Sequence, residues 1–280
     1  MNAQTESYDW VTARAEKWRA SVTSMEAMLA PVDDPLIAAL ALDRPLRILE
    51  VGSGGGGTTL ELARHAPEGS FVQGLDIAPV LVESARARLP HLTRRIAFDC
   101  VDAATAAPPG ELYERLVSRF AVMFFERPEE AFRNLRRWLV PGARFAFAVW
   151  GPIAENSWFS VARDAVAGLV PLSAPPPDAP GPFRYAQVES LLALLARSGF
   201  EKLEARTWRH PLLIGGGLSA AAAASFALES FSSFSELLSK AGGDAFEQAR
   251  RDLAARYSDF ERGGAVRADA SVHIVLGQSA

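Results

Sequence analysis

The arrangement of apolar and polar positions changes at residue 46. From there to residue 150, short apolar runs alternate with stretches of helical spacing, such as TTLELARHA and APVLVESARARL. The apolar runs cover residues 46–51, 71–77, 95–102, 112–125 and 143–150. Strands that alternate with helices of about 10–15 residues indicate a parallel sheet with helices on both faces. The sequence therefore predicts an α/β fold for this part of the chain.

Three segments lie outside this alternation. Residues 1–42 contain apolar side chains at helical spacing and predict a helical cap before a main domain at residues 43–280. Two insertions are expected in that domain, at about 151–186, which is rich in proline and glycine, and at 215–262, which is rich in glycine, alanine and serine. The remaining strand candidates are residues 201–214 and 266–277.

A glycine-rich turn joins the first predicted strand to the first predicted helix of the main domain. In LEVGSGGGGTTL, Gly52, Gly54 and Gly57 match the Gly-x-Gly-x-x-Gly pattern of dinucleotide-binding folds, and Asp76 ends the next strand, where a ribose-binding carboxylate belongs. Such a turn lets a ligand approach the backbone and the N–H groups at a helix start. From these residues alone, a nicotinamide cofactor, another nucleotide-like ligand and a purely structural turn all remain open.

Four ordered features separate these alternatives. Glu50 precedes the turn in ILEVGSGGG, Asp76 ends a strand in VQGLDIAP, and Asp102 and Ala103 follow a strand in FDCVDAAT. The fourth feature is SRFAVMFF, followed by the Pro-Gly turn of LVPGARFAFAVW. In this order and spacing, residues 46–150 resemble the class I S-adenosylmethionine-dependent methyltransferases. YDWVTARAEKW before the core, and ENSW and PGPF after it, resemble a bacterial small-molecule subgroup.

The resemblance implies a Rossmann-like, doubly wound sheet of seven strands whose last strand is antiparallel, with the insertions forming a helical lid over the substrate. It implies S-adenosylmethionine as cofactor and S-adenosylhomocysteine as product. Three positions depart from the family pattern: Glu50 replaces the commoner Asp, Gly55 stands where Thr is frequent, and Tyr113 begins the fourth strand where Phe is common. None of these changes removes a chemical group that the site needs.

Each part of this cofactor needs a different partner. The resemblance implies that Asp76 accepts hydrogen bonds from the ribose hydroxyls, and that Asp102 and the Ala103 N–H meet the adenine. Glu50 would orient the turn or meet the cationic amino group, and the end of the fourth strand would face the sulfonium and the tail. The expected cofactor-binding residues are Glu50, Gly52, Ser53, Gly54, Gly56, Asp76, Ile77, Asp102, Ala103 and Ser118.

The methyl acceptor is expected to bind beyond the carboxyl ends of the strands, under the three added segments. Methyl transfer from a sulfonium needs a general base only if the acceptor must lose a proton. Among the four histidines, His210 is the candidate for that role, and no other catalytic residue is assigned. Packing in the core and contact with the acceptor are both open for the aromatic candidates Tyr8, Trp18, Phe124, Trp150 and Trp158. Asn156 could bind the acceptor or form a turn, and Arg119, at the end of the fourth strand, is a further substrate candidate.

Composition narrows the class of partner. The chain has 29 basic and 33 acidic residues, a net charge of -4, which gives no electrostatic basis for binding nucleic acid. Cys100 is the only cysteine, which excludes an intramolecular disulfide framework and a cysteine-based zinc cluster, and we expect no metal. The N-terminus lacks a signal pattern and no stretch reaches the roughly 18 apolar residues of a membrane span, so we expect a cytoplasmic protein without a membrane partner.

The sequence therefore predicts a methyltransferase that uses S-adenosylmethionine on a small, partly hydrophobic molecule. Two alternatives stay open: a nicotinamide-dependent oxidoreductase, and a non-catalytic cofactor-binding protein of the same fold. The sequence does not identify the acceptor atom, the pathway or the oligomeric state.

Overall fold

The computed structural model describes residues 13–89, 95–174, 176, 178–231 and 233–280. The described chain begins with helix α2 (Ala13–Leu29), the 3-10 turn η1 (Ala30–Val32) and helix α3 (Asp33–Ala38). The N-terminal segment is therefore helical over these residues, as its spacing predicts. Tyr8, a candidate substrate residue, lies outside the described residues.

The centre of the molecule is a sheet with the strand order β3-β2-β1-β4-β5-β8-β6. Strands β1 to β5 run parallel, and β8 lies antiparallel between β5 and β6. The predicted doubly wound sheet with an antiparallel last strand is confirmed, with a short extra strand, β7 (Glu261–Arg262), paired to the start of β8. The other bounds are β1 (Arg47–Val51), β2 (Phe71–Asp76), β3 (Ile96–Cys100), β4 (Tyr113–Arg119), β5 (Leu139–Trp150), β6 (Phe200–Leu213) and β8 (Ala265–Ser279).

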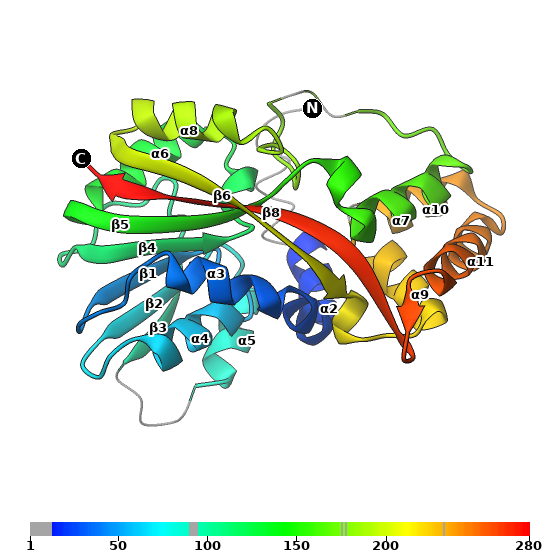
Figure 1. The fold of residues 1–280 in the computed structure, drawn as a ribbon, viewed down its shortest axis with the longest axis horizontal. Helices are drawn as coiled ribbons and strands as arrows, with labels where there is room; N and C mark the ends of the chain where they lie inside the picture. The colour runs from blue at the N-terminus through cyan, green and yellow to red at the C-terminus, as the bar shows by residue number, and fades with distance from the viewer. Residues whose placement is uncertain (1–12, 90–94, 175, 177, 232) are drawn as a thin grey trace.

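Helices cover both faces of this sheet (Figure 1). Helices α3, α4 (Gly57–His65) and α5 (Pro79–Ala87) pack on one face, and α6 (Pro128–Arg137) and α8 (Val188–Arg197) pack on the other. Pro79 and Pro128 each open a helix, where the missing N–H costs nothing. The central strands are buried between these layers, so their carboxyl ends form a rigid edge for a binding site.

A second group of helices, separate from the N-terminal helical segment, extends the molecule beyond one end of the sheet. We define the cap as α7 (Ser157–Ala167), α9 (Ala220–Ser230), α10 (Phe234–Ala241) and α11 (Ala245–Ser258). Helix α7 comes from the first predicted insertion and the other three come from the second, and α7 contacts all three. The long strands β6 and β8 continue past the sheet to reach the cap (Figure 1). The two insertions therefore meet in one helical layer.

The structure differs from the sequence prediction where the fourth strand ends. The apolar run at residues 112–125 predicts one strand, but β4 ends at Arg119 and a 3-10 turn, η2 (Val122–Phe124), follows. Phe120 lies between them with a φ angle of +60°. This left-handed angle departs from the extended backbone of β4, and the chain turns away from the sheet at this point.

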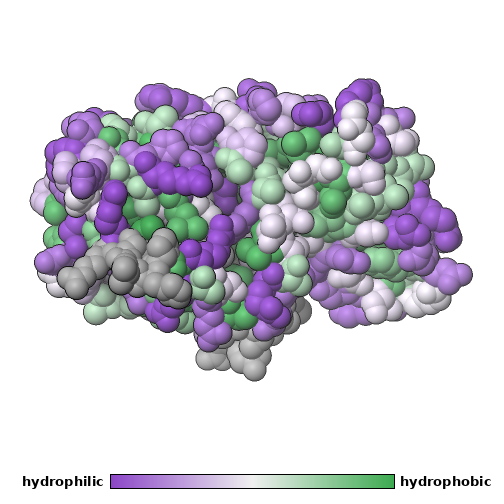
Figure 2. Space-filling view, turned by 90° about the horizontal axis from the view of Figure 1, so that it is seen from below, coloured by the Kyte–Doolittle hydropathy of each residue, from purple (hydrophilic) through white to green (hydrophobic). Residues whose placement is uncertain are grey.

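The face seen from below has hydrophilic and hydrophobic residues interspersed over both the sheet region and the cap (Figure 2). Within the residues that the structure describes, no helix has the length and apolar character that crossing a membrane requires. The same residues contain no group of three or more His, Cys, Asp and Glu side chains placed to hold a metal ion.

Candidate active site

The glycine-rich turn, residues 52–57, has a backbone that glycine adopts most readily. Gly52, Gly54 and Gly56 have φ angles of +75°, +52° and +87°, in the left-handed region. The N–H groups of Gly52 and Ser53 donate to the Leu75 carbonyl at 2.8 and 2.9 Å. These bonds hold the turn against the end of β2, at the carboxyl edge of the sheet where open α/β folds bind ligands.

Asp76 connects this turn to the start of α5 through both carboxylate oxygens. Its Oδ2 accepts the Gly54 N–H at 2.8 Å, and its Oδ1 accepts the Ala78 N–H at 2.9 Å. Burial raises the pKa of Asp76 above its ordinary value, and these N–H groups act to lower it. Each oxygen keeps a further lone pair, so the carboxylate can accept the two hydrogen bonds that a ribose diol would donate. The half-buried Ile77 follows Asp76.

Glu50 is an acidic residue within the buried part of β1, residues 48–51. It is 1% exposed and accepts a hydrogen bond from the Thr59 hydroxyl on α4. Burial raises the pKa of Glu50 to about 8, while Thr59 and the positive charge of Arg119 act to lower it. The contact with Thr59 orients α4 against β1; the approach of a cationic amino group to Glu50 stays a prediction.

The loop after β3 holds the residues expected beside the adenine. Asp102 accepts hydrogen bonds from the Ala104 N–H at 3.0 Å and the Thr105 hydroxyl at 2.7 Å. Ala103 is buried, and its carbonyl accepts the Asn134 amide at 3.1 Å, which fastens the loop to α6. These contacts shape the loop, and its role toward adenine stays a prediction.

Two features of the turn test whether S-adenosylmethionine fits here. Ser53 is buried, and its hydroxyl has no hydrogen-bond partner among the described residues. A Cβ atom built on Gly54 would lie 3.4 Å from Nε1 of Trp18, so this glycine has the indole of α2 against it. The free hydroxyl of Ser53 and a carboxylate with further acceptor sites suit a ribose and an amino-acid tail.

The end of β4 is held by two polar contacts. Ser118 is fully buried, and its hydroxyl donates to the Val51 carbonyl at 2.8 Å, which ties β4 to β1. Arg119 Nη1 donates to Asp33 Oδ2 at 2.9 Å, with side chains only 9% and 8% exposed. Burial raises the pKa of Asp33, although Arg119 and the Thr58 hydroxyl act to lower it. The candidate substrate residue Arg119 therefore forms a buried ion pair within the protein.

Aromatic rings connect the end of β4 to the cap. The Phe120 ring stacks on Trp150 with centroids 4.0 Å apart and planes 8° apart, and Trp150 lies 4.5 Å from Trp158 on α7. The left-handed backbone of Phe120 costs on the order of 1–3 kcal/mol, and such strain persists only where the surroundings hold it. Trp150 and Trp158 are buried, so this stack forms an apolar wall from the sheet edge into the cap.

The remaining acceptor candidates lie in different surroundings. Asn156 is fully buried; its amide donates to the carbonyls of Gly151 and Pro152, and its Oδ1 accepts from Trp158 Nε1 and the Ser271 N–H. These bonds give Asn156 the structural turn role that the sequence left open. Phe124 is half-buried in η2. His210 is exposed and pairs with Ala270 on β8, beyond the point where β5 ends.

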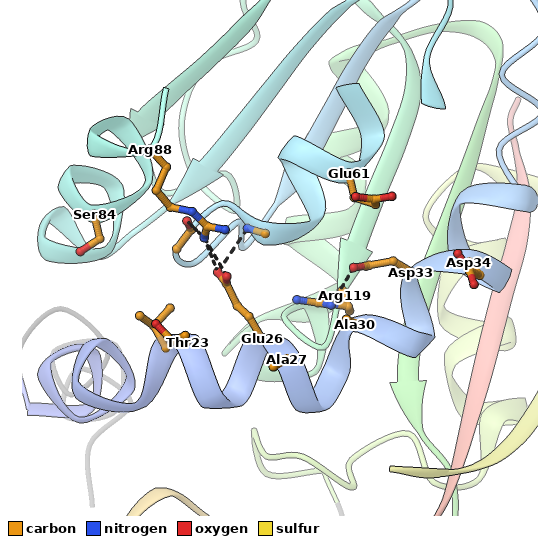
Figure 3. A pocket seen from close by; sticks show the side chains of 13 residues that line it. Thr23, Glu26, Ala27, Ala30, Asp33, Asp34, Glu61, Ser84, Arg88 and Arg119 are labelled. Carbon is orange, nitrogen blue, oxygen red and sulfur yellow. Dashed lines mark hydrogen bonds and ion pairs between the residues drawn. The ribbon is translucent and has the colours of Figure 1, made fainter. Parts of the chain in front are cut away.

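A cavity of about 700 Å³ lies between α2, the glycine turn and α5. Figure 3 shows Glu26 reaching from α2 to the turn, where Arg88 meets it, and Asp33 and Arg119 at the other end. Asp76 and Asp102 do not line this cavity, so it lies on the α2 side of the turn and not over the predicted ribose and adenine positions.

Sequence reasoning missed four residues around the site. Glu26, Asp33 and Arg88 hold the turn or the end of β4 from other elements, and no motif marks them. The backbone angle of Phe120 likewise has no signal in the sequence. Their roles depend on contacts between elements that are distant along the chain.

Comparison with known proteins agrees with this geometry. Residues 48–142 match the family model described as a methyltransferase domain. Over these residues the chain is similar to the class I S-adenosylmethionine-dependent methyltransferase family. It is 35% identical over 122 residues to the biotin biosynthesis bifunctional protein BioCD of Bordetella avium, a match that covers 44% of this chain and 25% of that protein.

A second relative is trans-aconitate 2-methyltransferase of Methylobacterium radiotolerans, 41% identical over 85 residues, which covers 29% of this chain and 31% of that protein. The part of this chain that matches these two curated relatives thus spans about a quarter to a third of their length. Phosphoethanolamine N-methyltransferase 2 of Haemonchus contortus, solved with S-adenosylhomocysteine, has a similar fold, with a TM-score of 0.52, 14% identity, and coverage of 89% of this chain and 52% of that chain.

Proposed function

We propose that this protein transfers a methyl group from S-adenosylmethionine to a small, partly hydrophobic molecule. The observation that supports this most directly is the position of Asp76. Its carboxylate fixes the Gly54 N–H of the glycine turn and still offers lone pairs at the sheet edge. The buried hydroxyl of Ser53 and the carboxyl group of Glu50 lie at the same edge, on the turn and at the end of β1.

The chain's residues would bind and align the reactants. When bound, S-adenosylmethionine supplies a methyl group on a positively charged sulfur, which an acceptor displaces in line. Alignment in a dry cavity can supply much of the acceleration of such a step. Asp76 would hold the ribose, Asp102 and Ala103 the adenine, and the stacked Phe120 and Trp150 would exclude water. We assign no general base; His210, exposed on β6 beyond the carboxyl end of β5, stays a candidate if the acceptor must lose a proton.

The start of α4 disfavours the nicotinamide alternative. Dinucleotide folds place a pyrophosphate at this helix N-terminus. Here the first N–H of α4, from Gly57, donates to the Glu26 carboxylate at 3.2 Å. Because Glu26 already occupies this N–H donor, the start of α4 favours a cofactor that places no phosphate there.

The acceptor side supports a small molecule with an apolar part. The Methylobacterium relative is named for trans-aconitate, a small molecule. In this chain, the wall of Phe120, Trp150 and Trp158 offers apolar surface beside the carboxyl end of β4. We therefore propose a small acceptor that places an apolar group against these rings.

Residues 1–42, 151–186 and 215–262 would act together as a lid over the acceptor. In α2, Lys17 bonds Ser235 and Glu236, each at 3.1 Å, and both partners lie in α10 of the cap. Gly215, Gly216 and Gly217 have φ angles of +59°, +85° and +118° and offer a hinge before α9. These contacts join the described part of the first segment to the third.

We expect hydrogen exchange at residues 215–217 and in α9 and α10 to be faster than in β1 and β4 without ligand, because active-site covers have low local stability. S-adenosylhomocysteine should slow exchange in these segments and leave the sheet unchanged. Full protection of the same segments in the free protein would show a rigid structural subdomain instead of a lid.

Titration calorimetry with S-adenosylmethionine, S-adenosylhomocysteine and NAD tests the proposed cofactor. We expect the first two to bind. Asp76→Ala should weaken binding about 10- to 100-fold, because hydrogen bonds to a charged group contribute about 1.5–3 kcal/mol. The matched control is Asp99→Ala, since Asp99 bonds Gln73 and Arg86 and not the turn.

Binding of NAD alone would overturn the proposal in favour of an oxidoreductase. Binding of S-adenosylmethionine without release of S-adenosylhomocysteine, across a broad screen of small acceptors, would favour the non-catalytic cofactor-binding protein. Equal affinity of the wild type and Asp76→Ala would show that another residue holds the ribose.

A further inference from the structure

Glu26 of α2 contacts the glycine turn from the side opposite Asp76. Its Oε1 accepts the Gly57 N–H at 3.2 Å. Both oxygens also accept hydrogen bonds from Arg88 Nη1, at 3.0 and 2.7 Å, and the same nitrogen donates to the Gly55 carbonyl at 2.6 Å. Glu26 is 17% exposed. Helix α2, the residue that follows α5 and the glycine turn are distant in the sequence. Through these contacts they meet at Gly55 and Gly57 of the turn.

These contacts explain the two glycines that the backbone angles do not. Gly55 and Gly57 do not have the left-handed angles of Gly52, Gly54 and Gly56. A Cβ atom on Gly57 would lie 2.9 Å from Cδ of Glu26, and all three of its nearest atoms belong to that side chain. A Cβ atom on Gly55 would lie 2.7 Å from Oε1 of Glu26. The missing side chains leave room for Glu26.

This packing also accounts for the departure from the family pattern at Gly55. A turn with glycines at both 55 and 57 loses more conformational entropy on ordering than one that carries side chains there. Glu26 and Arg88, which lie outside the turn, contact its backbone at Gly57 and Gly55 and so hold it in place of such side chains. The glycine turn is thus ordered by a side chain from α2, the helix whose Lys17 also bonds the cap.

We propose that Glu26, together with Arg88, is a positioning residue for the cofactor site. It sets the glycine turn in the conformation that presents Gly54 and Ser53 to the ligand. The inference rests on the proposed function, because the ligand of the turn is taken to be S-adenosylmethionine. It goes beyond that function by giving α2 a role in cofactor binding that the glycine motif itself does not contain.

The test is a double-substitution cycle at Glu26 and Gly57 with S-adenosylhomocysteine as the probe. Glu26→Ala should weaken binding about tenfold or more, in line with the loss of charge-assisted hydrogen bonds. Gly57→Ala should also weaken binding in the wild type, because the new methyl group displaces Glu26 from the Gly57 N–H. In the Glu26→Ala background the three atoms nearest to the new methyl group are gone, so the same Gly57→Ala change should leave affinity unchanged or improve it.

Two further variants separate positioning from general stability. Glu26→Gln keeps an acceptor for the Gly57 N–H, so it should recover part of the lost affinity. Glu16→Ala is the matched control, because Glu16 is an exposed glutamate of the same helix that bonds only Arg19 among the described residues. It should leave binding unchanged. Unfolding of every variant is followed by circular dichroism, so that loss of fold is not read as loss of affinity.

Additive effects of Glu26→Ala and Gly57→Ala would overturn the inference, as would wild-type affinity in folded Glu26→Ala. Failure of the wild type itself to bind S-adenosylhomocysteine would instead overturn the proposed function. The two failures are therefore distinguishable in one set of titrations.

Discussion

Arg119→Met is expected to destabilise the protein by about 3–5 kcal/mol, the usual cost of removing one partner of a buried ion pair. The Arg119 and Asp33 side chains are 9% and 8% exposed, so water solvates little of the carboxylate that remains. The Thr58 hydroxyl, at 2.9 Å from Asp33 Oδ1, compensates for only part of the charge. Urea unfolding of the wild type and Arg119→Met at neutral pH measures the difference.

The double variant Asp33→Asn with Arg119→Met separates the lost attraction from the cost of an unpaired charge. Because it buries no uncompensated carboxylate, it should be clearly more stable than Arg119→Met alone. The surface variant Arg127→Met breaks an exposed pair with Glu130 and should change stability by less than about 1 kcal/mol. A cost for Arg119→Met no larger than for Arg127→Met would contradict the prediction.

Much of the sheet could be predicted because each apolar run between residues 46 and 150 contains a strand or lies within one. In β1, residues 48–51 are all buried, which produces the continuous apolar run of a parallel strand. Glu50 is the acidic exception in that run, and the prediction that it belongs to a binding site rests on this exception. The left-handed angles at Gly52, Gly54 and Gly56 favour glycine at these positions. The glycine motif could therefore predict the conformation of the turn.

Contacts between distant elements could not be predicted in this way. Glu26 lies 31 residues before Gly57, and no periodicity relates the two positions. The acceptor side has a different difficulty, because a ring that packs in the core and a ring that lines a pocket have the same pattern in the sequence. Trp158 could have been either, and the structure places it against Trp150, Phe159 and Phe231.

Asn156 illustrates the same limit for a polar residue. The motif ENSW allows a side chain that binds a ligand or one that stabilises a turn. Only the fold shows that Trp158 Nε1 and the Ser271 N–H, from α7 and β8, both donate to its oxygen. The chemistry of a residue type limits its roles, and the neighbours that the fold supplies decide among them.

Glu50→Gln is expected to remove a large pH dependence from the free energy of unfolding. Burial raises the pKa of Glu50 from 4.5 to about 8, so between these values the folded protein keeps a proton that the unfolded chain releases. Stability contributed below pH 4.5 is therefore lost as the pH rises through 8. The loss is on the order of 5 kcal/mol, because each unit of pKa shift corresponds to about 1.4 kcal/mol. Glutamine does not ionise there, and it can still accept the Thr59 hydroxyl.

Urea unfolding of both proteins at several pH values from about 5 to about 8.5 measures this difference. Glu50→Gln should become the more stable protein toward the alkaline end, whereas the control Glu68→Gln, at an exposed position, should follow the wild type. Parallel curves for the wild type and Glu50→Gln would contradict the prediction. Saturating S-adenosylhomocysteine extends the test, because its amino group is a cation that would stabilise an ionised Glu50. If that group binds beside Glu50, the ligand should narrow the gap between the two proteins at high pH; a gap that stays constant would leave Glu50 only its contact with Thr59.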